Sequence, residues 1–234
     1  LGDAQRWGLL PTNPSSFVES PHPEPKEPAL WSMDELGSFV AAMLEGEGGQ
    51  YSYLYAFLMA SGCREGEAFG LRWADVDWPA GTVRIERQLT WVRNRPLELP
   101  PKTKAGKRSI TLPPWGMEAL RRQRAGQAER KLRAGGGWTG GDRVFTTENG
   151  SVPSPTNLRR SLHAICKRLA LPPIRIHDLR HLHLSLLAMC GVPVKVVQQR
   201  AGHSTPTLTL RVYQHVLGDG DREAAEAIAK ALPR

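Results

Sequence analysis

The sequence predicts an α+β domain that is mainly helical, with a small antiparallel β-sheet. Two observations predict this class. Apolar residues recur at helical spacing over most of the chain, whereas residues 82–87 (Thr-Val-Arg-Ile-Glu-Arg) alternate and are rich in β-branched side chains. The composition, 40% hydrophobic and 23% charged, is that of a globular protein. We therefore expect one folded domain in which a single sheet follows the third helix.

The start of the chain is set apart by its prolines. Six of them exclude a helix or a central strand: Pro11, Pro14, Pro21, Pro23, Pro25 and Pro28. Residues 1–28 are therefore expected to form an extended linker or arm, and the folded domain to occupy residues 29–234. Ordered structure is expected to begin at Ser32, which forms a capping-box pattern with Glu35.

The remaining elements follow from periodicity and from glycine and proline signals. Gly62 and Gly191 are suited to end the helices that precede them. Helices are predicted over residues 50–61, 65–71, 113–133, 155–169, 177–190, 193–201 and 222–232. Strands are predicted over residues 82–87, 89–92 and 108–112.

The charge is unevenly distributed. Residues 1–50 carry a net charge of −6 and residues 51–234 a net charge of +14, which favours a polyanionic partner such as nucleic acid. The longest uncharged apolar stretch, residues 51–63, is too short to cross a bilayer, and no signal-peptide pattern opens the chain. Three cysteines without a C-x-x-C pair indicate no disulfide framework, and we expect a cytoplasmic protein. The chain has no initiator Met, which suggests a fragment.

A first candidate site lies in the segment His177-Asp-Leu-Arg-His181. His177 and Arg180 are three residues apart near the start of a predicted helix, where an imidazole and a guanidinium can bind a phosphate. A metal site built from His177, His181 and His183 is one alternative, and ordinary buried or surface histidines without a function are another. No carboxylate or cysteine completes such a ligand set, so no metal is expected.

Three further segments carry candidate residues. Arg64 and Glu67 are spaced to form an ion pair, either buried or on the surface. Residues 101–108 form a basic turn that is either solvated or in contact with DNA phosphates. His203 follows Gly202 in a turn and could cap a helix, and Tyr213, ten residues later, would by itself be read as a packed aromatic residue.

In this order and spacing, the segments resemble the catalytic domain of tyrosine recombinases, the phage integrase family. The resemblance runs from about residue 30 to residue 217. Its strongest parts are the segment at 177–181, the Gly202-His203 pair with its following tyrosine, and residues 61–67 (Ser-Gly-Cys-Arg-Glu-Gly-Glu) followed by Gly-Leu-Arg-Trp. Cys63 and Ala201 stand where larger apolar residues are usual, which we interpret as packing changes.

The resemblance implies DNA strand transfer through a 3′-phosphotyrosine intermediate, without metal, ATP or another cofactor. Tyr213 would be the nucleophile, and Arg64 and Arg180 would hold the phosphate oxygens that gain charge. His177 would be the base, and His203 would donate to the phosphate or orient the tyrosine. The acid would be Lys102, for which Lys104 is a competitor, and Glu67 would support Arg64.

The resemblance also implies partners. Double-stranded DNA would be bound in part by a basic surface comprising Arg159, Arg160, Lys167, Arg168 and Arg175. The helix within residues 219–232 would either fold back on its own domain or be exchanged between subunits. Exchange would give a homo-tetramer on paired DNA sites, although the isolated chain could be monomeric. Residues 1–28 would follow an N-terminal core-binding domain that the chain lacks.

We therefore expect a site-specific recombinase or integrase of a mobile element, encoded by a bacterium or a phage and acting at the nucleoid. One alternative with the same chemistry is a type IB-like topoisomerase or a resolvase of replicon ends. Another is a DNA-binding regulator that keeps the scaffold without catalysis.

Overall fold

The structure, a computed structural model, describes residues 1–19, 31–93, 95–101, 104–207, 209–210, 212–213 and 221–231. It confirms the α+β class. Its helices are α1 (Gly2–Arg6), α2 (Met33–Leu44), α3 (Ser52–Ser61), α4 (Glu65–Gly70), α5 (Pro114–Ala134), α6 (Pro155–Arg168), α7 (Ile176–Met189), α8 (Val194–Ala201) and α10 (Asp221–Ala231).

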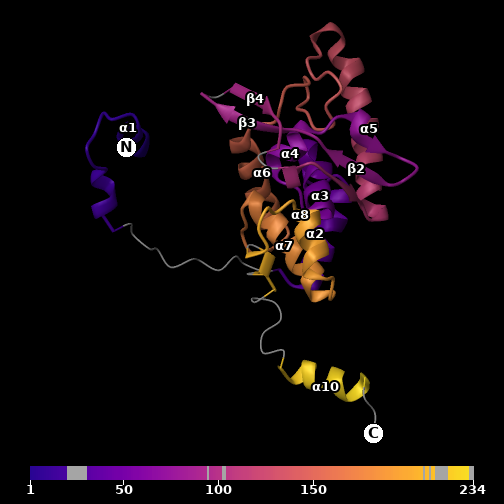
Figure 1. Ribbon diagram of the computed structural model, residues 1–234. Helices are drawn as coiled ribbons and strands as arrows, with labels where there is room; N and C mark the ends of the chain where they lie inside the picture. The colour runs from indigo at the N-terminus through magenta and orange to yellow at the C-terminus, as the bar shows by residue number, and fades with distance from the viewer. Residues whose placement is uncertain are drawn as a thin grey trace.

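The expectation of a single sheet is wrong. A three-stranded antiparallel sheet has the order β1 (Val76–Asp77), β2 (Thr82–Ile85), β5 (Arg108–Thr111), and a separate hairpin pairs β3 (Gln88–Val92) with β4 (Arg95–Leu99). β4 escaped prediction because Pro96 argues against a strand, although Leu97 and Leu99 flank a polar residue as in a strand, and all five residues are exposed. The hairpin lies at the edge of the molecule (Figure 1).

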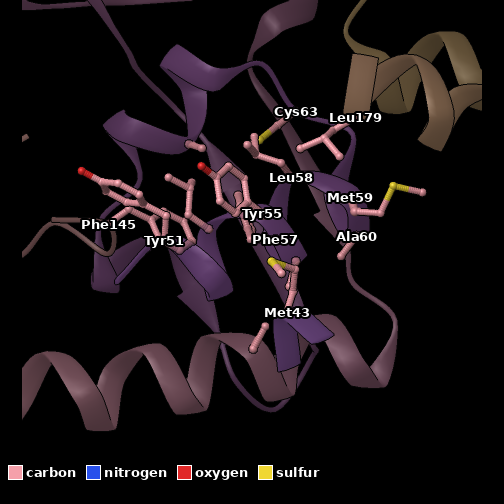
Figure 2. Close-up of a cluster of buried hydrophobic side chains, with 14 of the residues drawn as sticks. Met43, Tyr51, Tyr55, Phe57, Leu58, Met59, Ala60, Cys63, Phe145 and Leu179 are labelled. Carbon is pink, nitrogen blue, oxygen red and sulfur yellow. The ribbon is translucent and has the colours of Figure 1, made fainter. Parts of the chain in front are cut away.

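Helix α3 forms the centre of the core. Nine of its ten residues are buried, because it packs against α2, α5 and α7. Its aromatic side chains lie among Met43, Cys63, Phe145 and Leu179 (Figure 2). The Tyr55 hydroxyl donates to the carbonyl of Leu158 at 2.7 Å, which satisfies the polar atom inside the core and links α3 to α6.

The ends of α2 and α3 follow the sequence signals. The Glu35 carboxylate accepts from the Ser32 amide at 2.6 Å, and the Ser32 hydroxyl accepts from the Glu35 amide at 3.2 Å, as a capping box requires. Gly62 ends α3 in the left-handed conformation at φ +62°. The helix predicted from residue 50 begins instead at Ser52, after a 3₁₀ turn over Gly49–Tyr51.

Two glycines on α4 let this short helix lie directly on the hairpin. A Cβ at Gly66 would lie 2.4 Å from the carbonyl oxygen of Leu89, and a Cβ at Gly70 would lie 2.9 Å from that of Arg87. Both contacts are with backbone, which does not yield easily to a side chain. The close approach fixes α4, and with it Arg64 and Glu67, against β3.

The N-terminal segment contains more local structure than its prolines suggest. Besides α1, a 3₁₀ turn spans Pro14–Phe17, and the Asn13 side chain caps it by accepting from the Ser15 amide. Neither element buries a residue, and α1 and α10 both stand apart from the body of the molecule (Figure 1). Among the described residues, no helix combines the length and apolar character that a membrane span needs.

Candidate active site

Arg180 occupies the centre of the site on the first turns of α7. Only 3% of its surface is exposed, and its guanidinium donates to the carbonyls of Gly62 and Ala201, each at 2.7 Å. Burial and then the nearby charge of Arg64 lower the pKa of Arg180 to about 10, so it remains charged at neutral pH. Because Gly62 precedes Arg64 by two residues, the contact brings the two arginines together.

Arg64 is held by a carboxylate from its own helix. Glu67, 2% exposed, accepts from the Arg64 guanidinium at 3.0 Å and from the Arg64 amide at 2.9 Å. Burial opposes ionisation of Glu67, but hydrogen bonds from Arg108 and Arg64 outweigh it and lower the pKa. The expected ion pair is therefore present and lies at the edge of the interior, with Glu67 buried and the Arg64 side chain 38% exposed.

His203 uses both of its ring nitrogens. Nε2 lies 2.7 Å from Arg180 Nη2, and because a guanidinium only donates, Nε2 accepts. Nδ1 then carries the proton and donates to the buried hydroxyl of Thr209 at 2.9 Å. Burial and the charges of Arg180 and Arg64 lower the pKa of His203 to about 4, so the ring is neutral at pH 7.

His177 and Arg64 line the same open cleft. The cleft has a volume of about 550 Å³ and lies between the start of α4 and the β3–β4 hairpin. The ring of His177 packs edge-on against that of His181, with the centroids 4.8 Å apart. Desolvation, then the charges of His181 and Arg180, lower the pKa of His177 below its usual 6.5, although its side chain faces the cleft. A neutral imidazole beside an arginine can accept a proton.

Tyr213 is not brought to this cluster. It is 8% exposed and packs in a small second core with Leu184, Ala188, Val197 and Ala201. Its hydroxyl donates to the carbonyl of Val192, and burial raises its pKa above 10. The phenol is thus held as a neutral hydrogen-bond donor.

The side chains of both candidate lysines lie outside the described part of the structure. Lys102 lies outside the described residues, and for Lys104 the structure describes only the backbone, in a 3₁₀ turn over Lys104–Gly106. Gly106 packs directly against Pro101, since a Cβ at position 106 would lie 2.5 Å from the Cβ of Pro101.

Two of the five residues of the predicted basic surface are engaged in ion pairs. Arg160 and Lys167 are exposed on the face of α6 opposite Leu158, Leu162 and Ile165, and Arg159 is exposed beside them. Arg168 instead pairs with Glu47 at 3.5 Å, and Arg175 with Asp178 at 2.8 Å. In the described part of the chain, no group of three His, Cys, Asp or Glu side chains is placed to hold a metal.

Comparison with known sequences decides the family. The sequence model of the phage integrase family matches residues 33–218. The chain belongs to the phage integrase family. A tyrosine recombinase XerC-like protein of Caldanaerobacter subterraneus is 28% identical, with 94% of this chain and 57% of the relative covered. The ICEBs1 integrase of Bacillus subtilis is 25% identical, with 96% and 60% covered. This chain thus spans less than two thirds of the length of these phage integrase relatives.

Solved structures agree with this assignment at the level of the fold. The integrase of transposon Tn1549, in complex with transposon right end DNA, superposes with a TM-score of 0.72 at 21% identity, over 95% of this chain and 71% of the other. XerA recombinase superposes with a TM-score of 0.61 at 19% identity, over 92% and 68%. The body described above is therefore a phage integrase fold.

Two polar residues that support the site in this member of the phage integrase family were not predicted from its sequence. Arg108 binds Glu67, and Thr209 orients His203. Arg108 could have been found, because it shares the inward face of β5 with Ile110 two residues later. Thr209 could not be found in this way, since no periodic pattern relates it to His203, six residues earlier, whose Nδ1 it binds.

A second pair that was missed, His183 and Arg200, lies beneath the site. His183 is 6% exposed; its Nε2 accepts from Arg200 Nε at 3.0 Å, and Nδ1 lies 2.8 Å from the carbonyl of Met59. Burial, then the charge of Arg200, lower the pKa of His183 to about 3. The folded state therefore holds this ring neutral.

This pair predicts a loss of stability in acid. Below pH 6.5 the unfolded chain protonates His183 while the folded chain does not, so stability falls as the pH falls from about 7 towards 3. At pH 5, His183 alone is expected to lower the free energy of unfolding by about 2 kcal/mol. Urea unfolding of the unaltered chain and of His183→Gln, which keeps polar partners without titrating, measures the difference. Parallel pH dependence in the two proteins would contradict it.

Proposed function

We propose that this chain is the catalytic part of a site-specific DNA recombinase or integrase that cuts and rejoins strands through a 3′-phosphotyrosine. One observation carries the proposal: Arg64, which lines the cleft, lies near the buried Arg180, and the positive charge of the two guanidinium groups is only partly neutralised. Glu67 faces Arg64 and Arg108, whereas the hydrogen bonds described for Arg180 go to two carbonyls and a neutral imidazole. A phosphodiester anion satisfies such a site.

In the proposed reaction, the Tyr213 oxygen attacks the scissile phosphorus and its proton passes to His177. The phosphorus–oxygen bond to the 5′ carbon breaks, and Lys102 or Lys104 protonates the departing oxygen. Arg64 and Arg180 hold the non-bridging oxygens, which gain charge in the five-coordinate transition state. His203 keeps Arg180 in place while both of its nitrogens are engaged, and Glu67 does the same for Arg64.

Tyr213 has to leave its present position for this reaction. Its hydrogen bond to Val192 and its packing in the second core hold the hydroxyl away from the arginines. We infer that DNA binding releases the segment that carries it. The position of Tyr213 thus favours a chain that does not cleave DNA until DNA binding has moved this residue to the arginines.

The arginines supply the charge that metal ions supply in other phosphoryl-transfer sites, so we propose that neither a metal nor ATP is needed. Nicked half-site DNA from the sequence flanking the gene tests both points, because the cleaved end diffuses away and traps the adduct. The proposal expects a protein–DNA adduct that survives denaturation and forms at the same rate with excess EDTA and without ATP. Purely salt-sensitive binding with no adduct would favour the regulator instead.

The exposed basic side chains of α6 lead to a prediction about how the affinity for DNA depends on salt concentration. Lys167 is exposed, and no ion pair involves it among the described residues, so its charge is free to meet a phosphate. Lys167→Ala is expected to weaken binding to all DNA sequences alike and to reduce the slope of log affinity against log salt by about 1. Fluorescence anisotropy at several salt concentrations measures the slope. Arg168→Ala is the comparison, and its smaller effect follows from its pairing with Glu47.

The partner beyond DNA is proposed to be further copies of this chain. Helix α10 stands apart from the body, and Ile228 on it is 63% exposed (Figure 1). An apolar side chain on an amphipathic helix favours burial against a neighbouring subunit, in keeping with a tetramer on paired DNA sites. The fold of the Tn1549 integrase, which binds DNA in its structure, supports the choice of double-stranded DNA.

A further inference from the structure

The guanidinium of Arg108 joins three segments that lie far apart in the sequence. It donates to both carboxylate oxygens of Glu67, at 3.2 and 2.9 Å. Its Nε donates to the carbonyl of Arg200 at 2.7 Å, and Nη1 donates to that of Gly106 at 2.9 Å. The side chain is 8% exposed, so these partners replace water around the charge.

Each of these segments carries a group of the proposed reaction. Glu67 holds Arg64 through a second pair of contacts, at 3.0 and 2.9 Å. Arg200 stands three residues before His203, at the end of α8. Gly106 closes the 3₁₀ turn that begins at Lys104, one of the two candidate lysines. A shift of Arg108 therefore displaces an arginine, a histidine and a lysine together.

The turn at Gly202 is shaped to admit Arg108. Gly202 has φ +65°, which disfavours other residues, and a Cβ there would lie 2.8 Å from Arg108 Nη1 and 3.0 Å from the carbonyl oxygen of Ala105. The glycine of the Gly-His pair thus lets the guanidinium and the lysine turn pack against the end of α8. This packing places Arg108 where these segments meet.

We propose that Arg108 is a positioning residue for strand cleavage, which sets Arg64, His203 and the lysine turn relative to one another. The inference rests on the proposed function. Arginine is required because Nε and both terminal nitrogens of its planar guanidinium donate to different partners: the carbonyls of Arg200 and Gly106 and the carboxylate of Glu67. One lysine ammonium cannot reach all three. Arg108 acts through these partners and not by contact with the phosphate.

Arg108→Lys tests the inference while keeping the charge. We expect the single-turnover rate of adduct formation at saturating half-site DNA to fall about 10–100-fold, because small displacements of reacting groups are costly. Affinity for the half-site should stay close to that of the unaltered chain. Arg121→Lys is the matched control, since this arginine of α5 is 58% exposed, pairs with Glu118 of its own helix and should leave the rate unchanged. An unchanged rate in Arg108→Lys, or a loss confined to affinity, would overturn the inference.

A double-mutant cycle tests the route through Arg64. If Arg108 acts partly by positioning Arg64, Arg108→Lys lowers the rate by a smaller factor in an Arg64→Lys background than in the unaltered chain. The same factor in both backgrounds would show that the residues act independently and would reject this route. Glu67→Gln, which removes the shared charge while nearly keeping the shape, is expected to reproduce the rate loss if Arg108→Lys proves too unstable to study.

Amide hydrogen exchange gives a readout that does not depend on cleavage. Arg108→Lys should raise exchange in residues 64–70 and in residues 198–203 together, and Arg121→Lys should change neither. Unchanged exchange in either segment would overturn the inference. A chain that forms no adduct in its unaltered form would overturn the proposed function instead, and the exchange result would still decide the role of Arg108.

Discussion

Tyr213→Phe is expected to reduce covalent adduct formation on nicked half-site DNA to below detection. The substitution removes the only atom of this side chain that can attack phosphorus, while the ring keeps its place in the second core. The lost hydrogen bond to Val192 should cost about 1 kcal/mol of stability, so the chain still folds and binds DNA. Denaturing gels of end-labelled half-sites measure the adduct.

Tyr53→Phe is the control for this prediction. Tyr53 is a half-buried tyrosine on α3 that packs against the core, and the loss of its hydroxyl should leave adduct formation unchanged. An adduct that persists in Tyr213→Phe would mean that another side chain is the nucleophile. Anisotropy with the same DNA verifies that the altered protein still binds.

Arg180→Lys is expected to slow adduct formation by about 10²–10³-fold or more, although the charge is kept. A lysine cannot bond Gly62, Ala201 and His203 while also presenting two donors to a phosphate. Carbonyl oxygens would be left unpaired in the interior, so a loss of about 1–3 kcal/mol of stability should accompany the slower rate. Single-turnover kinetics at saturating DNA separate the rate from affinity.

The matched substitution is Arg121→Lys on α5. Arg121 is 58% exposed, and its one ion pair among the described residues is with Glu118 of its own helix, so the exchange should change neither rate nor stability measurably. A rate for Arg180→Lys within a few-fold of the unaltered chain would remove Arg180 from the phosphate site. Thermal unfolding of both variants establishes that the rates belong to folded protein.

Local signals in the sequence predicted local structure well. The Ser32 capping box and the end of α3 at Gly62 depend on contacts within a few residues, and both appear as expected. The partition of the strands into two sheets depends on which strands pair across the chain. Residues 82–85 and 108–111 share one sheet, whereas residues 88–92 pair with residues 95–99, an exposed strand that contains a proline.

The contacts of the candidate site were likewise predictable only in part. The convergence of Arg64 and Arg180 was expected only from the family resemblance, and in the structure Arg180 donates to the carbonyl of Gly62, two residues before Arg64. The contacts of Arg108 required β5 and α8 to meet, which no local pattern encodes. The hydrogen bond from Tyr213 to Val192 likewise arises only when the end of α7 folds against the later segment.

The support of Arg180 by main-chain oxygens has a consequence for how this site tolerates sequence drift. Every residue type offers the same carbonyl, so replacing the side chains at neighbouring positions does not by itself remove these acceptors. Neutral acceptors also orient the guanidinium without cancelling its charge. A scaffold of this kind can exchange most of its side chains over time and still present the same cation at the same point.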